Sequence, residues 1–116
     1  MKIVLDGTEY QVLTDNNDTV ADIVAAAPLR MRMVRYDGHE YYDTLPFTPR
    51  VSSPQTSRLL AGHIYYWAGG NSFVINFKDY DIAPYKSVHV GEFQDAATIA
   101  DILRDAPDKI SITIEK

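Results

Sequence analysis

The stretch AGHIYYWAGGNSFVINFKD, residues 61–79, decides the fold of this chain. Two runs rich in aromatic and β-branched residues flank a Gly-Gly-Asn turn at residues 69–71. Such runs on either side of a glycine-asparagine turn are typical of an antiparallel β-hairpin. The sequence therefore predicts a hairpin in the middle of the chain, and the neighbouring segments are interpreted by how they can pair with it.

Short strands are predicted on both sides of this hairpin. Asp6-Gly7 is a second hairpin turn signal, and the residues that follow Pro28 alternate apolar and charged side chains as a half-buried strand does. The last strand alternates three isoleucines with polar residues. Outside the hairpin, the predicted strands are residues 1–6, 9–13, 29–36, 39–44, 88–93 and 110–114.

Two short amphipathic helices are predicted between the strands. The first has apolar residues at i, i+3, i+4 and i+7 over Val20–Ala27, preceded by polar side chains at residues 16–18 that can cap its first amides. Asp95 is predicted to cap the second helix, and a proline ends each helix. The apolar face of the second helix is predicted to be Ile99, Ile102, Leu103 and Ala106.

These elements favour one architecture. The predicted fold is mainly β, with a closed or nearly closed eight-stranded antiparallel barrel and two short helices that cap its open ends. Closure would also remove the exposed sheet edges that such hydrophobic strands otherwise present for aggregation. The whole chain, residues 1–116, is expected to form this single domain.

Composition limits the possible partners. The net charge is −5, which argues against nucleic acid even though Arg30, Arg32 and Arg35 lie close together on one predicted strand. Without cysteine there is no disulfide, thiol nucleophile or thiolate metal site. No segment approaches the roughly 20 apolar residues that cross a bilayer, and the first residues do not resemble a secretory signal. We therefore expect a cytoplasmic protein with no membrane partner.

Residues 43–61 differ from the rest of the chain. They contain Pro46, Pro49 and Pro54 together with several serines and threonines. A connection of this length with little room for regular structure is usually a binding loop, a lid or a mobile segment. Residues 80–87, which contain Pro84, are also predicted to be a loop.

Several motifs in the middle of the chain resemble a cyclophilin-like β-barrel family of small prokaryotic proteins. In that family a Leu-Pro pair begins a long loop, here Leu45-Pro46, and the loop closes on Ala-Gly followed by an apolar-Tyr-Tyr step, here within Ala61–Tyr66. A Gly-Asn turn leads into a strand that ends in Lys-Asp, here Gly70-Asn71 to Lys78-Asp79. An apolar strand with one glycine follows, here Val88–Phe93. The proline usual in the hairpin turn is replaced by Ala-Gly-Gly.

The resemblance implies a cyclophilin-type eight-stranded barrel but not the activity of a cyclophilin. Prolyl isomerisation by cyclophilins is thought to need an arginine beside an apolar proline pocket. The matching sequences in active members are a Phe-His-Arg strand and a later Phe-Met-x-Gln run, and neither occurs in this chain. A weak peptidyl-prolyl cis-trans isomerase is therefore the alternative hypothesis, with Arg32, Arg35 or Arg58 in the role of that arginine.

No other chemistry is indicated. His39, His63 and His89 each lie in a predicted strand without a spacing typical of zinc ligands, so no metal site and no cofactor are predicted. The serines of the long loop lack a Gly-x-Ser-x-Gly context, and the acidic residues are scattered singly. We therefore predict no catalytic residues.

The aromatic residues are the better indication of a site. Tyrosine and tryptophan combine a large apolar area with one polar group, which suits a binding cleft, and they concentrate around the central turns and the long loop. In the hairpin, Ile64 and Tyr66 share one face and Tyr65 and Trp67 the other. Either one pair fills the barrel and the other packs under the loop, or the second pair serves a site. The candidate ligand-binding residues are Tyr36, Glu40, Tyr42, Arg50, Arg58, Trp67 and Asn71.

The leading hypothesis is a non-catalytic binding module that takes a short peptide or a small molecule in an aromatic-lined groove. Besides the isomerase, a structural or oligomerisation domain whose exposed aromatics pair protomers is the remaining alternative. The sequence does not predict the natural ligand or the oligomeric state.

Overall fold

Ten strands and two helices make up the protein, as described by a computed structural model of residues 1–116. The strands are β1 (Lys2–Leu5), β2 (Thr8–Thr14), β3 (Leu29–Tyr36), β4 (Glu40–Thr44), β5 (Arg58–Leu59), β6 (His63–Trp67), β7 (Ser72–Asn76), β8 (Tyr80–Asp81), β9 (Val88–Phe93) and β10 (Lys109–Glu115). The helices are α1 (Asp18–Ala26) and α2 (Ala96–Arg104), and a short 3-10 turn, η1 (Ala68–Gly70), follows β6.

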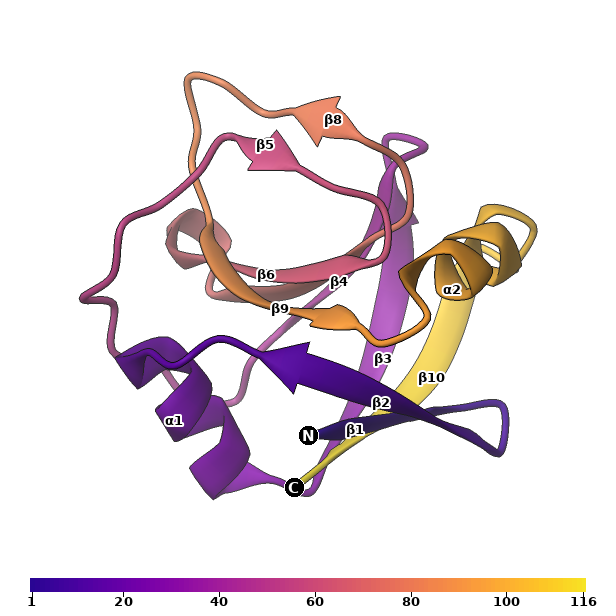
Figure 1. Ribbon diagram of the computed structural model, residues 1–116, viewed down its shortest axis with the longest axis horizontal. Coiled ribbons are helices and arrows are strands. Elements are labelled where there is room, and N and C mark those ends of the chain that lie inside the picture. Colours follow the sequence, from indigo (N-terminus) through magenta and orange to yellow (C-terminus); the bar gives the residue numbers. More distant parts are fainter.

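Eight strands close into an antiparallel barrel in the order β1-β10-β3-β4-β7-β6-β9-β2 (Figure 1). The predicted barrel is thus confirmed. The close approach of β2 and β9 within the barrel requires a glycine at position 91, because a Cβ atom there would lie 2.5 Å from the carbonyl oxygen of Leu13. Asp6 and Gly7 both have positive φ, as the two-residue turn between β1 and β2 requires.

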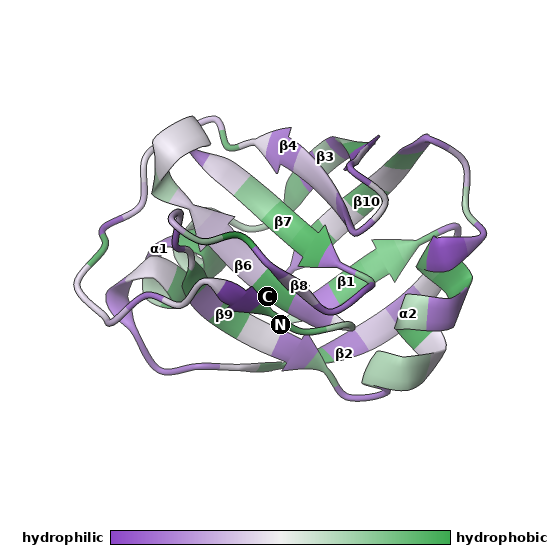
Figure 2. Ribbon diagram, turned by 90° about the horizontal axis from the view of Figure 1, so that it is seen from above, coloured by the Kyte–Doolittle hydropathy of each residue, from purple (hydrophilic) through white to green (hydrophobic).

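The predicted hairpin is β6 and β7, which pair with Ile64 opposite Ile75 and Tyr66 opposite Phe73. Its connection is longer than a two-residue turn: η1 is followed by Asn71 in the left-handed conformation, with φ 48°. β7 is the one strand in which every residue is buried, since the barrel core lies on one side of it and further chain covers the other. Figure 2 shows much of β7 in the colour of hydrophobic residues.

The barrel interior holds the main hydrophobic core, to which Ile64 and Tyr66 contribute from the hairpin. α1 and α2 lie at opposite ends of the barrel (Figure 2) and bury Ile23 and Leu103, respectively, against this core. Their capping role is as predicted. Neither helix combines the length and the apolar character needed to span a membrane.

The two helix predictions differ in accuracy. Asn17 caps α1 as expected, with its side-chain oxygen accepting the Val20 N–H at 2.9 Å. In α2, however, Asp95 occupies the cap position without a side-chain hydrogen bond. The predicted face was also partly wrong: Ile102 is 40% exposed, and Ala100 is buried instead. Compared with the prediction, the helix is rotated about its axis, and Ile99 and Leu103, four residues apart, lie at the centre of its buried face.

Both predicted loops contain a short strand that the sequence did not reveal. β5 and β8 pair as a separate two-stranded sheet, with Arg58 opposite Asp81 and Leu59 opposite Tyr80, and Thr56 bridges to Ser87. Two-residue strands have no detectable period, so hydrophobic alternation could not predict them. We call residues 56–59 and 80–87 the outer ribbon.

The outer ribbon lies outside the barrel, over β6 (Figure 1). Beneath it, Leu59, Tyr65 and Val74 form a second, small hydrophobic cluster. The outward face of the hairpin is therefore divided: Tyr65 packs under the ribbon, whereas Trp67 remains 37% exposed.

Candidate functional site: an aromatic pocket outside the barrel

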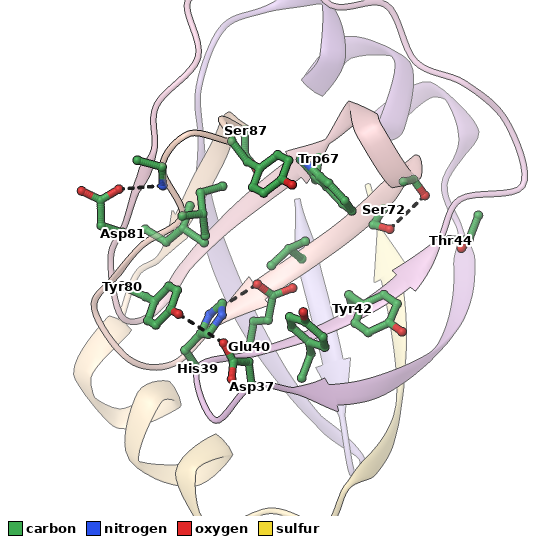
Figure 3. A pocket seen from close by; sticks show the side chains of 17 residues that line it. Asp37, His39, Glu40, Tyr42, Thr44, Trp67, Ser72, Tyr80, Asp81 and Ser87 are labelled. Carbon is green, nitrogen blue, oxygen red and sulfur yellow. Dashed lines mark hydrogen bonds and ion pairs between the residues drawn. The ribbon is translucent and has the colours of Figure 1, made fainter.

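A cavity with a volume of about 660 Å³ lies between the outer ribbon and the outer surface of β4, β7 and β6 (Figure 3). Small-molecule sites in proteins commonly have volumes of about 300–1,000 Å³. The lining residues are Tyr36, Asp37, His39, Glu40, Tyr42, Thr44, Leu59, Trp67, Gly70, Ser72, Val74, Tyr80, Asp81, Ile82, Ala83, Tyr85 and Ser87.

Four tyrosines and one tryptophan line the pocket. Tyr36 and Tyr42 meet edge to face with ring centroids 6.0 Å apart, and Trp67 and Tyr85 do the same at 6.1 Å. Tyr36, Trp67, Tyr80 and Tyr85 all belong to the few large hydrophobic side chains that the protein leaves exposed. Exposed apolar groups gathered in one concave place indicate a binding surface rather than random surface variation.

The Gly69-Gly70 pair makes room for Trp67. A Cβ atom on Gly69 would lie 2.9 Å from the indole ring, and one on Gly70 would lie 2.8 Å from it. The ring therefore rests directly on the glycine backbone of η1 at the edge of the pocket. This packing explains in physical terms why small residues follow Trp67 in the hairpin connection.

One end of the pocket is polar and contains His39, Glu40 and Asp37. The His39 ring is 2% exposed and stacks on Tyr80 with centroids 4.0 Å apart. Its Nδ1 lies 3.1 Å from Oδ1 of Asn76 and 3.3 Å from Oε1 of Glu40.

The Asn76 amide fixes the tautomer of His39. The Asn76 Nδ2 donates to the Lys78 carbonyl at 2.7 Å, so the amide oxygen faces His39 and can only accept. Nδ1 of His39 must then carry a proton and donate it to Asn76. Glu40 shares this single N–H at a longer distance and has no donor of its own.

Burial is the main cause of the raised pKa of Glu40. The Glu40 side chain is 13% exposed, and this burial, with a smaller contribution from the nearby negative Asp37, raises the pKa of Glu40 to about 7. Asp37 in turn accepts a hydrogen bond from the Tyr80 hydroxyl at 3.2 Å, which raises the pKa of Tyr80. The pocket thus holds a carboxyl group that titrates near neutral pH. Such a group can act as a proton donor or acceptor, or as a counter-ion.

The structure brings four of the seven predicted site residues together. Tyr36, Glu40, Tyr42 and Trp67 all line the pocket. They come from β3, β4 and β6, and the pairing of β3 with β4 sets Tyr36 opposite Glu40. These four remain candidate ligand contacts.

Asn71 does not reach the pocket and has a structural role instead. Its side-chain oxygen accepts the Tyr66 hydroxyl at 2.6 Å, and its Nδ2 donates to the carbonyls of Leu45 at 3.2 Å and Phe47 at 2.9 Å. These bonds join the hairpin connection to the start of the long loop. Both N–H donors of the side-chain amide are therefore used within the protein.

Arg50 also lies away from the pocket. Its guanidinium bonds Asp22 on α1 through Nε and Nη2 and lies 3.7 Å from Asp18, so the long loop is fastened to that helix. This pairing lowers the pKa of Asp22. Arg50, a predicted ligand-binding residue, therefore has a structural role and does not line the pocket.

The remaining arginines considered above are not in the pocket lining either. Arg58 is exposed on β5 beside Asp81. Arg35 donates to the Leu103 carbonyl at 3.1 Å and lies over the Phe77 ring, so it fastens α2 to the barrel. Arg32 is exposed on β3. No arginine belongs to the pocket lining, where the isomerase hypothesis needs one.

Sequence reasoning missed His39, Asp37 and Tyr85 as pocket residues. His39 and Asp37 flank the turn glycine Gly38, which has φ 67° and reverses the chain so that both sides of the turn lie near the pocket. Tyr85 lies in a segment predicted as a plain loop. An isolated tyrosine in a loop was the only available signal, and it does not tell which way the ring points.

A second polar cluster lies on the outer surface of β6 and β9. Nδ1 of His63 and Nε2 of His89 are 2.8 Å apart, His89 contacts Asp15 at 2.6 Å, and His63 lies 3.3 Å from Glu92. Two neutral imidazoles supply two N–H groups for these three contacts, so one added proton lets all three form. Burial, followed by the neighbouring His89, lowers the pKa of His63. No group of three or more His, Asp or Glu side chains is arranged to hold a metal ion.

Comparisons with known proteins agree with the barrel. The chain is similar to a hypothetical protein from Archaeoglobus fulgidus whose structure was solved in solution, with a TM-score of 0.74, 18% identity, and coverage of 98% of this chain and 91% of that chain. At this identity the likeness shows the fold alone. No curated protein matches the chain. The sequence model described as the Cyclophilin-like family matches residues 3–115. The chain therefore belongs to the cyclophilin-like family.

Proposed function

We propose that this protein is a binding module, without catalysis, that takes a small organic molecule or a short peptide in the aromatic pocket between the barrel and the outer ribbon. The observation that carries the proposal is the concentration of exposed rings in one cavity: Tyr36, Trp67 and Tyr85 are 56%, 37% and 62% exposed and all line it. Exposed rings on a rigid scaffold supply contact area at a low entropic cost.

The surroundings of the pocket suit binding. The barrel strands beneath it are fixed by their ladders on both sides, so the positions of Tyr42 and Val74 are set before a ligand arrives. The outer ribbon, in contrast, is a pair of two-residue strands. A ligand would therefore contact the rigid barrel strands on one side and the outer ribbon, which has fewer backbone hydrogen bonds, on the other.

A fragment titration tests the proposal. A panel of aromatic fragments and short peptides is added to ¹⁵N-labelled protein, and amide shifts are followed by NMR. We expect saturable shifts at Tyr42 and Val74, and loss of binding in Tyr85→Ala. Leu13→Ala serves as the matched control, because Leu13 is 55% exposed but lies on β2 outside the pocket. Fragments that shift only residues outside the pocket would reject the proposal.

Self-association is distinguished in the same samples. If the exposed rings pair protomers, the Tyr42 and Val74 amides shift with protein concentration alone, and light scattering reports a dimer. The binding proposal expects a monomer whose spectrum is independent of concentration. A dimer that Tyr85→Ala dissociates would instead support the oligomerisation alternative.

A further inference from the structure

The charges that face the pocket all have one sign. Its lining includes Asp37, Glu40 and Asp81 but neither lysine nor arginine, although the chain contains 11 of these basic residues. The three carboxyl groups are not equivalent. Asp81 accepts the Ala83 N–H at 2.9 Å and Asp37 accepts the Tyr80 hydroxyl, so both already have donors. Glu40 is the exception.

The Glu40 carboxyl group is largely buried, and the only donor near it is shared with Asn76. The nearest donor is the His39 N–H, 3.3 Å away, which Asn76 engages at 3.1 Å. A buried carboxylate without a full counter-charge costs free energy, and the pocket lining supplies neither lysine nor arginine to offset that cost. The other titratable groups that face this end of the pocket are Asp37, Tyr36 and Tyr80, none of which is cationic.

The surrounding rings complement this carboxyl group. Tyr36 lies opposite Glu40 in the pairing of β3 with β4 and meets Tyr42 edge to face. Tyr42 and Trp67 also belong to the pocket wall (Figure 3). Aromatic faces attract cations through their quadrupoles, and the attraction is stronger where water is displaced. A carboxylate flanked by rings therefore favours a ligand with a positive nitrogen over a neutral or anionic one.

We propose that the pocket binds the protonated amino group of an organic amine, with Glu40 as its counter-ion and the tyrosine and tryptophan rings around it. This inference rests on the proposed binding function and names its ligand class. The amine can be a free small molecule or the side chain of a lysine in a peptide. The chemistry of recognition is the same for both.

A pair of isosteric probes tests the inference. Phenethylamine and 2-phenylethanol differ in one group, charged in the first and neutral in the second, and each is titrated at pH 6 and pH 8 with NMR detection of pocket amides. We expect phenethylamine to bind about tenfold more tightly at pH 8 than at pH 6, because ionised Glu40 rises about tenfold over that range while the amine stays charged. The affinity of 2-phenylethanol should not depend on pH in this way.

Variants make the result specific to Glu40. In Glu40→Gln the preference for the amine and its pH dependence should both disappear, while 2-phenylethanol binds as before. Glu9→Gln is the matched control, because Glu9 lies on β2 outside the pocket and pairs with Lys2. A peptide with a single lysine and its acetylated form make the same comparison for a peptide source. Tighter binding of phenethylamine than of the peptide assigns a free amine, and the reverse assigns a lysine side chain.

The outcomes separate the two proposals. If the amine and the alcohol bind equally well at both pH values, or if Glu40→Gln keeps the preference, the amine inference is wrong and the binding function stands. If neither probe shifts the pocket amides, and the fragment panel shifts none either, both proposals fail.

Discussion

The two faces of the same strands use aromatic residues in opposite ways. Inside the barrel, Tyr66 and Phe73 are at most 1% exposed, and the Tyr66 hydroxyl is hydrogen-bonded to Asn71. Outside, Tyr36 and Trp67 are 56% and 37% exposed, and the pocket that they line with Glu40 contains neither lysine nor arginine. The interior is packed for stability. The exterior keeps exposed rings and a largely buried carboxyl group that lower the stability of the free protein, and a bound ligand would offset this loss. Such a loss of stability is common at functional sites.

The largest effect is expected inside the barrel. Phe73→Ala removes a fully buried ring and should lower the free energy of unfolding by about 3–5 kcal/mol in urea denaturation. Such a loss is close to the whole stability of many small domains. Phe73→Leu, which fills most of the cavity, should restore most of the loss. If Phe73→Ala is nearly neutral, the interior is not packed as described.

On the outer face, removing a charge should stabilise the protein. The pKa of Glu40 is raised from 4.5 to about 7, so between these pH values the folded state holds a proton that the unfolded chain has released. Stability therefore falls as the pH rises from about 4.5 to about 7, and the full loss is present above pH 7. Glu40→Gln should therefore raise the free energy of unfolding at pH 8 by up to about 3 kcal/mol. Wild type and variant should converge as the pH falls toward 4.5. An equal difference at both pH values would contradict the titration of Glu40.

Asn71 belongs to the connection between β6 and β7, and its substitution tests whether this connection serves stability or ligand binding. Asn71→Ala leaves the Tyr66 hydroxyl without its acceptor and the carbonyls of Leu45 and Phe47 without a donor. Thermal unfolding should show a loss of about 2 kcal/mol, while the affinity for pocket ligands stays unchanged. A loss of ligand binding at unchanged stability would show that Asn71 contacts the ligand, as the sequence predicted.

Trp67→Ala should show the opposite behaviour. The indole is partly exposed and rests on two glycines, so its removal should change the unfolding free energy by less than about 1 kcal/mol. Ligand titrations should show that binding to the pocket is lost. Ile102→Ala, on the exposed side of α2, is the control for the loss of an exposed apolar side chain. A large stability loss with binding intact would reverse the assignment.

The smallest effect is expected at the His63–His89 pair. Because the folded-state pKa of His63 is lowered, the unfolded chain takes up a proton that the folded protein resists as the pH falls below about 6.5. The stability that neutral His63 contributes is present above that pH and is lost below it. Urea denaturation between pH 7 and pH 5 should therefore show a shallower decline for His63→Gln than for wild type. Parallel curves would show that His63 does not titrate in this way.

The sequence predicted the barrel well because its signals are local. The hairpin at residues 61–79 and the cap at Asn17 depend on residues that are neighbours in the chain, and both are confirmed. The outer ribbon was missed because residues 58–59 and 80–81 are too short to carry a period. Packing against the barrel determines which side of α2 is buried. Ile102 was therefore wrongly predicted to belong to the buried face.

The candidate site was predicted in part for the same reason. Tyr36 and Glu40 come together through neighbouring strands, which alternation and turns anticipate. The position of Arg50 depends instead on Asp22, 28 residues away, and that of Asn71 on the carbonyls of the long loop. Side chains at the ends of loops find partners that no local pattern specifies, so two plausible ligand contacts proved to be structural.

Trp67 allows the most direct test, because it is the only tryptophan in the chain and it lies in the pocket. Its fluorescence therefore reports on the outer face and not on the barrel interior. Titration of wild-type protein with phenethylamine at pH 8 should change the intensity or the emission maximum in a saturable way, and in Glu40→Gln the midpoint of this change should move to a higher phenethylamine concentration. An emission spectrum that stays constant up to ligand concentrations at which NMR detects binding elsewhere would contradict the account.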